Sequence, residues 1–131
     1  MGTRKYAAIV EQKYLWLKPQ LDDHTRWLKS GFKKGRRLSL FGHNLTEIEL
    51  SGLDLSYSSL NGGVNLSKAN LREVNLTGAE MSGVNLTDAD LTNAILHEVE
   101  LFRADLTNVD LTKANVRNIS ISLAILKNTK I

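Results

Sequence analysis

Large aliphatic residues recur at intervals of five along most of the chain, beginning with Leu40, Leu45 and Leu50. A smaller apolar residue, usually Ala or Val, stands two positions before most of them, and polar residues fill the remaining positions. A period of five fits neither an α-helix at 3.6 nor a β-strand at 2.0. The pattern predicts a chain that turns a corner after each short extended piece, with two side chains per repeat pointing inward.

Four such pieces close a square coil of about 20 residues, and successive coils stack at the β-sheet spacing of about 4.8 Å. This register predicts internal columns of aliphatic side chains. One column should contain Leu45, Leu66, Leu86, Leu106 and Leu126, and another should contain Leu60, Met81, Leu101 and Ile121. One residue is inserted at Asn61-Gly62-Gly63, where we expect a bulge or a distorted corner because glycine tolerates unusual backbone angles.

The repeat has the consensus Ala/Val-Asn/Asp-Leu-Ser/Thr-x. It is clearest in Ala69-Asn70-Leu71-Arg72, in Ala89-Asp90-Leu91-Thr92 and in Ala104-Asp105-Leu106-Thr107. In this the chain resembles the pentapeptide-repeat family. The resemblance implies an all-β solenoid, a right-handed quadrilateral β-helix of nearly five coils, with a short α-helical cap at its N-terminus. We therefore divide the chain into a helical head, residues 1–37, and a β-helix, residues 38–131.

Within the head, residues 3–17 have the spacing of an amphipathic helix, with apolar positions at Tyr6, Val10, Tyr14 and Leu17. We expect Pro19 to end this helix. A second short helix is predicted from near Leu21 to Ser30-Gly31.

An open solenoid end exposes unpaired sheet edges, which invite aggregation unless they are covered. The segment from His24 to Gly31 is similar to the lead-in of many bacterial pentapeptide-repeat proteins. We expect Trp27, Leu28 and Phe32 to form a lid on the first coil, with His43 lying beneath it.

Charge is distributed unevenly. Residues 1–37 carry ten Lys/Arg and three Asp/Glu, for a net +7, whereas residues 38–131 have a net charge of −4. Six of the cations form a basic run that could attract nucleic acid, anionic lipid or an acidic protein face. They are Arg26, Lys29, Lys33, Lys34, Arg36 and Arg37. The alternative is a solvated charge cluster on the cap.

The C-terminal coil departs from the repeat. Ile125 occupies a position that usually holds Asn or Asp, and Leu123 occupies one that usually faces water. The register places Phe102 one coil above Ser122, and the sequence ends at Ile131. Apolar patches of this kind usually mark interfaces, so we predict one at Phe102, Leu123, Ile125 and Ile131. The alternative is that these apolar residues lie on the surface of the terminal coil without a binding role.

The sequence contains no convincing catalytic, cofactor or metal site. Its three histidines are far apart, and cysteine is absent. Asp54, Asp90 and other acids stand directly before the central Leu, where we expect structural ladders instead of paired catalytic carboxylates. We predict that the protein is not an enzyme. We also expect a soluble cytoplasmic protein, since no apolar run is long enough to span a bilayer and no secretory signal is evident.

These features favour a non-enzymatic scaffold for protein–protein interaction, with its C-terminal coil docking a partner or a second copy. The resemblance implies one alternative, because some members of the family mimic duplex DNA and bind DNA gyrase, which confers resistance to topoisomerase inhibitors. Such mimicry needs a strongly acidic rod, and the net −4 of the solenoid beside a head of +7 counts against it. A further alternative is binding of nucleic acid or an anionic surface through the basic head.

Overall fold

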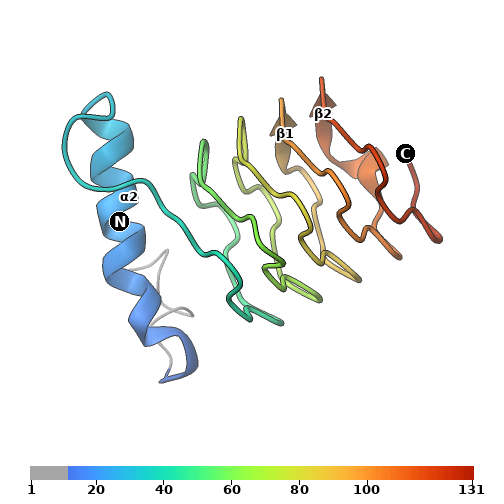
Figure 1. Ribbon diagram of the computed structural model, residues 1–131, viewed down its shortest axis with the longest axis horizontal. Coiled ribbons are helices and arrows are strands. Elements are labelled where there is room, and N and C mark those ends of the chain that lie inside the picture. The colour runs from blue at the N-terminus through green and yellow to red at the C-terminus, as the bar shows by residue number, and fades with distance from the viewer. Residues whose placement is uncertain (1–11) are drawn as a thin grey trace.

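The computed structural model describes residues 12–131. A short 3₁₀ helix, η1 (Gln12–Leu17), leads directly into α2 (Lys18–Lys29). From residue 38 the chain winds into a stack of coils, and α2 lies across the N-terminal end of that stack (Figure 1). The regular elements within the stack are β1 (Ile95–His97), η2 (Leu111–Lys113) and β2 (Asn115–Arg117).

The first helix prediction needs correction. Residues 3–11 lie outside the described residues, and Gln12–Leu17 is 3₁₀ helix. Pro19 does not end a helix but lies in the first turn of α2. Proline is tolerated there because its missing N–H would have no acceptor within the helix. The helix ends at Lys29, as predicted, and Gly31 then adopts the left-handed conformation with φ 67°.

The coils stack in parallel with the predicted register. Single-residue β-bridges join Asn44 to Asn65, Asn65 to Asn85, and Asp105 to Ile125. The offset is 21 residues across the insertion and 20 elsewhere, which confirms the predicted columns. The four faces form a right-handed quadrilateral β-helix, as predicted. Among residues 12–131, β1 and β2 alone are paired over three residues.

Most corners are tight turns in which the residue two positions after the central Leu adopts a positive φ. The corner after Leu111 differs, because it is formed by the 3₁₀ helix η2. The N–H of Ile48 donates to the carbonyl of Leu45 at 3.1 Å, and Glu47 between them has φ 65°. A positive φ at this place is the mark of a type II turn. At the insertion, Gly62 and Gly63 both have positive φ, 80° and 77°, so the expected corner distortion is present.

The acidic and amide residues before the central Leu stabilise these corners. The carboxylate of Asp90 accepts hydrogen bonds from the N–H of Thr92 at 3.0 Å and from its hydroxyl at 2.6 Å. The hydroxyl bond is the main reason that the pKa of Asp90 lies below its usual 3.8. Asp54 and Asp105 bind the residue two positions on in the same way. These acids therefore act as the structural ladder that the repeat predicted.

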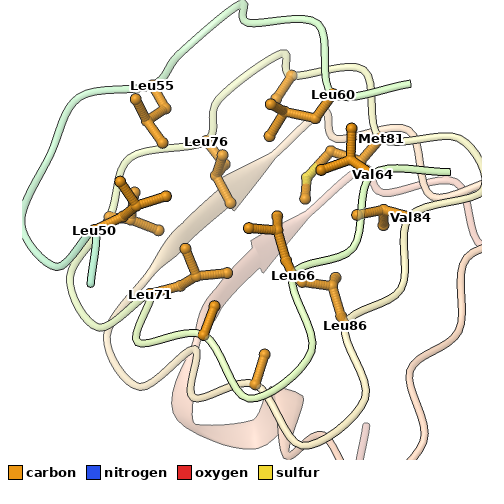
Figure 2. Close-up of a cluster of buried hydrophobic side chains, with 14 of the residues drawn as sticks. Leu50, Leu55, Leu60, Val64, Leu66, Leu71, Leu76, Met81, Val84 and Leu86 are labelled. Carbon is orange, nitrogen blue, oxygen red and sulfur yellow. The ribbon is translucent and has the colours of Figure 1, made fainter. Parts of the chain in front are cut away.

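The core is a stack of aliphatic layers. Figure 2 shows Leu55 beside Leu76 and Leu60 beside Met81 in successive coils, and all four are at most 2% exposed. The void among the leucines of the first coils and the head has a volume of about 10 Å³. That is at the lower limit for a single water molecule, so this void cannot admit a substrate.

The core opens towards the C-terminus. Leu106 and Leu111 are buried, whereas Ile121 and Ala124 are only partly buried. Leu126, in the same column as Leu106, is 39% exposed. The terminal coil, defined here as residues 112–131, is the last coil of the stack (Figure 1), and it exposes apolar side chains such as Leu126 and Ile131.

Candidate functional site

The backbone hydrogen bonds between coils give the solenoid two chemically different edges. The N–H groups of Leu45 and Glu47 donate forward to the carbonyls of Asn65 and Ser67, at 2.7 and 2.9 Å. One bond returns, from the N–H of Asn65 to the carbonyl of His43 at 3.0 Å. This pattern of two forward bonds and one return bond repeats along the stack. The N-terminal edge is therefore rich in acceptors, and the C-terminal edge is rich in N–H donors.

Side chains of the head supply donors to the N-terminal edge. The hydroxyl of Tyr14 donates to the carbonyl of Thr46 at 2.6 Å, and Nε2 of His24 lies 3.0 Å from the carbonyl of Ser56. In the next coil the equivalent carbonyls, those of Ser67 and Thr77, accept N–H groups from the preceding coil. Tyr14 and His24 thus replace the donors that an earlier coil would provide.

His24 is the buried histidine of this junction, with 1% of its surface exposed. Its Nδ1 accepts a hydrogen bond from the backbone N–H of Leu38 at 2.8 Å, so the proton of the neutral ring lies on Nε2, which donates to Ser56. Burial lowers the pKa of His24 below its usual 6.5, against the opposing effects of the Ser56 hydrogen bond and the negative charge of Asp54. Leu21 follows Leu17 by four residues and His24 follows Leu21 by three, so helical spacing places the three on one face, and this spacing is the signal in the sequence that identifies His24.

The lid differs from its predicted composition. Its buried face is formed by Leu17, Leu21 and His24. Trp27 and Leu28 are half-buried, and Phe32 is 55% exposed, so these three lie towards the rim.

The expected position of His43 beneath the lid is wrong. His43 is exposed, and its ring stacks on Trp16 at a centroid distance of 4.7 Å. The aromatic Trp16, which is 39% exposed, covers it from the side of η1.

An aromatic row extends from the lid onto the first coil. Trp27 stacks on Phe32 at 4.4 Å, and Phe32 meets the ring of Tyr57 edge-on at 5.9 Å. A surface hollow of about 280 Å³ lies along this row. It is lined by Trp27, Phe32, Arg37, Tyr57, Gly78 and Glu80. Its lining combines three aromatic rings with the ion pair between Arg37 and Glu80.

The six cations of the predicted basic run differ in their contacts, because two of them form ion pairs. Arg26 pairs with Asp23 on α2. Arg37 pairs with Glu80 at 2.8 Å and donates from Nε to the carbonyl of Tyr57 at 2.6 Å, so it holds the head to the solenoid. The other four, Lys29, Lys33, Lys34 and Arg36, are exposed.

The predicted apolar residues of the C-terminal end are all exposed. Phe102 is 40% exposed, Ile125 is 52% exposed, and Leu123 and Ile131 are each 67% exposed. The N–H of Arg103 donates to the carbonyl of Ser122 at 2.9 Å, which sets Phe102 beside Ser122 in the next coil, as the register predicted. Leu126 adds to this surface. Sequence reasoning assigned it to the core column and therefore missed it.

The terminal coil also has a charge of its own. Its charged residues are all cations, Lys113, Arg117, Lys127 and Lys130, for a net +4. All four are exposed. Residues 38–111, in contrast, carry three Lys/Arg and eleven Asp/Glu, for a net −8. The net charge of the whole solenoid hides this change of sign between its two parts. The basic rim around the apolar end was therefore not predicted.

Within residues 12–131 the structure contains no group of three or more His, Asp or Glu side chains that could hold a metal ion. Across the same residues, no helix combines the length and apolar character needed to traverse a lipid bilayer. That the protein is not an enzyme stays a prediction.

Known proteins resemble the chain in its repeat region. A family model for pentapeptide repeats matches residues 62–98 with eight copies. A pentapeptide repeat protein from the thylakoid lumen of Arabidopsis thaliana is 34% identical, with a TM-score of 0.61 over 66% of this chain and 60% of that one. No curated protein matches the chain.

Two cyanobacterial structures also match. HetL from Nostoc, a pentapeptide repeat protein involved in heterocyst differentiation regulation, is 36% identical, with a TM-score of 0.47 over 76% of this chain and 44% of that one. The pentapeptide repeat protein Rfr23 from Cyanothece is 28% identical, with a TM-score of 0.41 over 76% and 64% of the two chains. The chain spans less than two thirds of the length of each of these three structures. The repeat and the stacking register agree with the family model and with the Arabidopsis structure, and the chain is a pentapeptide-repeat protein.

Proposed function

We propose that the protein is a non-enzymatic scaffold that binds another protein through the open end of its terminal coil. The observation that carries this proposal is the contrast between the two ends of the same solenoid. At the N-terminal end, apolar side chains and backbone acceptors are covered by Leu17, Leu21, Tyr14 and His24. At the C-terminal end, Leu123, Ile125, Leu126 and Ile131 are exposed.

Such an end supports docking for two physical reasons. Covering the exposed aliphatic groups removes apolar surface from water, which contributes about 25 cal/mol per Å². Pairing with the open backbone edge adds main-chain hydrogen bonds, as in strand addition to a sheet edge. The occupant is a partner protein or a second copy of the chain.

The matched variants Ile125→Asp and Ile95→Asp test this proposal. Both replace an isoleucine at a position that the repeat normally fills with Asn or Asp. Ile125 lies at the open end, whereas Ile95 lies between Asn75 and Asn115 in the stack. We expect both variants to fold, and only Ile125→Asp to reduce binding.

Two measurements read the outcome. Light scattering over a range of concentrations reports self-association, and capture from lysate of the native host, after nuclease treatment, reports other proteins. A dimer or a stoichiometric captured protein that Ile125→Asp removes and Ile95→Asp retains would support docking at this end. Binding that neither variant changes would place the interface elsewhere and refute the proposal.

A second candidate function is binding of nucleic acid or an anionic surface through the head. The observation in its favour is that Lys29, Lys33, Lys34 and Arg36 are exposed and form no ion pair among the described residues. Binding by these cations should weaken steeply with salt, because each phosphate contact releases a counterion. Nucleic acid recovered from lysate by the parent protein but not by a Lys33→Glu/Lys34→Glu variant would support it.

A further inference from the structure

The open edge of the terminal coil offers mainly hydrogen-bond donors. Leu126 and Asn128 occupy the positions whose N–H groups donate forward in earlier coils, as those of Leu106 and Asn108 donate to Ile125 and Lys127, each at 2.9 Å. Among the described residues no carbonyl lies beyond the terminal coil to receive them. A partner that covers this edge must therefore bring acceptors in excess of donors.

The charges of the terminal coil also favour a partner that is rich in acceptors. The terminal coil, whose edge offers the N–H groups, also carries four exposed cations, Lys113, Arg117, Lys127 and Lys130. Carboxylates satisfy both features, because they are acceptors without donors and they carry the opposite charge.

The opposite end of the molecule shows the complementary arrangement. Residues 38–58 carry three Asp/Glu and no Lys/Arg, and the described part of the head that covers them, residues 12–37, has a net charge of +6. The head also brings side-chain donors, from Tyr14 and His24, to carbonyls of that edge. The acceptor-rich, acidic end is thus covered by a basic segment with donors.

A second copy of the chain fits the terminal coil poorly. Two terminal coils placed face to face would oppose two donor-rich edges and two charges of +4. In a head-to-tail arrangement the terminal coil would meet the basic head, because that head already covers the acceptor-rich edge. Both arrangements bring like charges together, which costs binding energy.

From these observations we propose that the terminal coil binds an acidic, partly apolar segment of a different protein. Aliphatic side chains of the segment cover Leu126 and Ile131, and its Asp and Glu side chains pair with the cationic rim and the open N–H groups. This inference rests on the proposed docking function and specifies its partner. A lipid surface is disfavoured, because it offers no ordered row of acceptors to the backbone edge.

Selection from a displayed library of random peptides tests the inference with the full chain as target. We expect the selected peptides to be net negative and to contain aliphatic residues. Their affinity should fall by about tenfold or more for a Lys127→Glu/Lys130→Glu variant, because attraction to two rim charges becomes repulsion. The matched control is Lys13→Glu/Lys68→Glu, two exposed lysines outside the terminal coil, which should leave the affinity unchanged. All four lysines are exposed, so both variants should fold.

Other outcomes separate this inference from the docking function. Uncharged apolar peptides that depend on Ile125 but not on the lysines would overturn the acidic partner and keep the docking end. Peptides that depend on neither would refute both. A dimer that Ile125→Asp dissociates would make a second copy the occupant and overturn the inference. Sedimentation with phosphatidylserine vesicles that requires Lys127 and Lys130, without any selected peptide, would overturn it in favour of a lipid surface.

Discussion

The backbone N–H of Leu38, the first residue of the β-helix, donates to Nδ1 of His24 in the head at 2.8 Å. The bond requires a neutral imidazole, because a protonated ring has N–H groups at both nitrogens and no acceptor. Nε2 of the same ring meets the carbonyl of Ser56, on another face of the first coil. One buried side chain therefore joins the head to two separate points of the solenoid.

This arrangement predicts that the protein loses stability on mild acidification. The pKa of His24 in the folded protein lies below its usual 6.5 because of burial, so the unfolded chain binds more protons than the folded chain. The contribution is complete above pH 6.5 and falls as the pH decreases below that value. The slope is at most about 1.4 kcal/mol per pH unit for one such group. Denaturant unfolding between about pH 5.5 and 7.5 measures it.

Two variants identify the responsible group. His24→Gln should remove this slope and lower stability at neutral pH, whereas His43→Gln, on an exposed ring, should retain it. The hydrogen bond from Thr92 holds the pKa of Asp90 below its usual 3.8, so that carboxylate loses its contribution only at lower pH. A slope that survives in His24→Gln would show that another group titrates.

Removing the Tyr14 hydroxyl should also weaken the junction. Tyr14→Phe leaves the ring in place but leaves the carbonyl of Thr46 without its donor, which should cost about 1–2 kcal/mol in the free energy of unfolding. The control is Tyr57→Phe, since the Tyr57 hydroxyl makes no hydrogen bond within the described part of the chain. Equal losses in the two variants would contradict a specific role for the Tyr14 bond.

The loop after α2 provides a matched pair of glycines. A Cβ on Gly35 would lie 2.9 Å from the backbone N of Trp27, whereas one on Gly31 would meet no atom within 4 Å. Both have positive φ, so alanine at either position costs about 1 kcal/mol or more in backbone strain. Gly35→Ala should cost about 1–3 kcal/mol beyond Gly31→Ala, because backbone atoms of α2 must move. It should also speed hydrogen exchange of the Arg36 N–H, which bonds to the carbonyl of Asp23.

Much of the fold follows from periodicity. The recurrence of Leu every five residues, with one insertion before Val64, was enough to place Leu45 over Leu66 and Leu86 in one column. A repeat allows this because each coil contacts only its neighbours, so local spacing determines the global arrangement. The exposure of Leu123 and Ile125 followed from the same register.

The ends could not be predicted in this way, because they are where the repeat stops. The pairing of Tyr14 with Thr46 joins residues 32 positions apart and depends on how the head crosses the first coil. The pattern of the repeat carries no information about that crossing. Pro19 was misread because the same residue that breaks a helix interior also starts one. Leu126 was assigned to the core because its column predicts burial only when another coil covers it.

Burial in a column depends on a covering coil, and this gives a prediction for two leucines of the same column. Leu86 is 1% exposed and Leu126 is 39% exposed, although the repeat places them identically. Leu86→Ala should reduce the free energy of unfolding by about 2–5 kcal/mol, as for other buried leucines, because it leaves a cavity between two coils. Leu126→Ala should cost about 1 kcal/mol, because water already reaches that side chain. Denaturant unfolding of the two variants at neutral pH gives the comparison. Similar large losses in both variants would mean that something other than the described residues covers the terminal coil in solution. A loss that shrinks when the protein is diluted would identify the cover as a second copy, whereas a loss that does not depend on concentration would indicate a segment of the same chain.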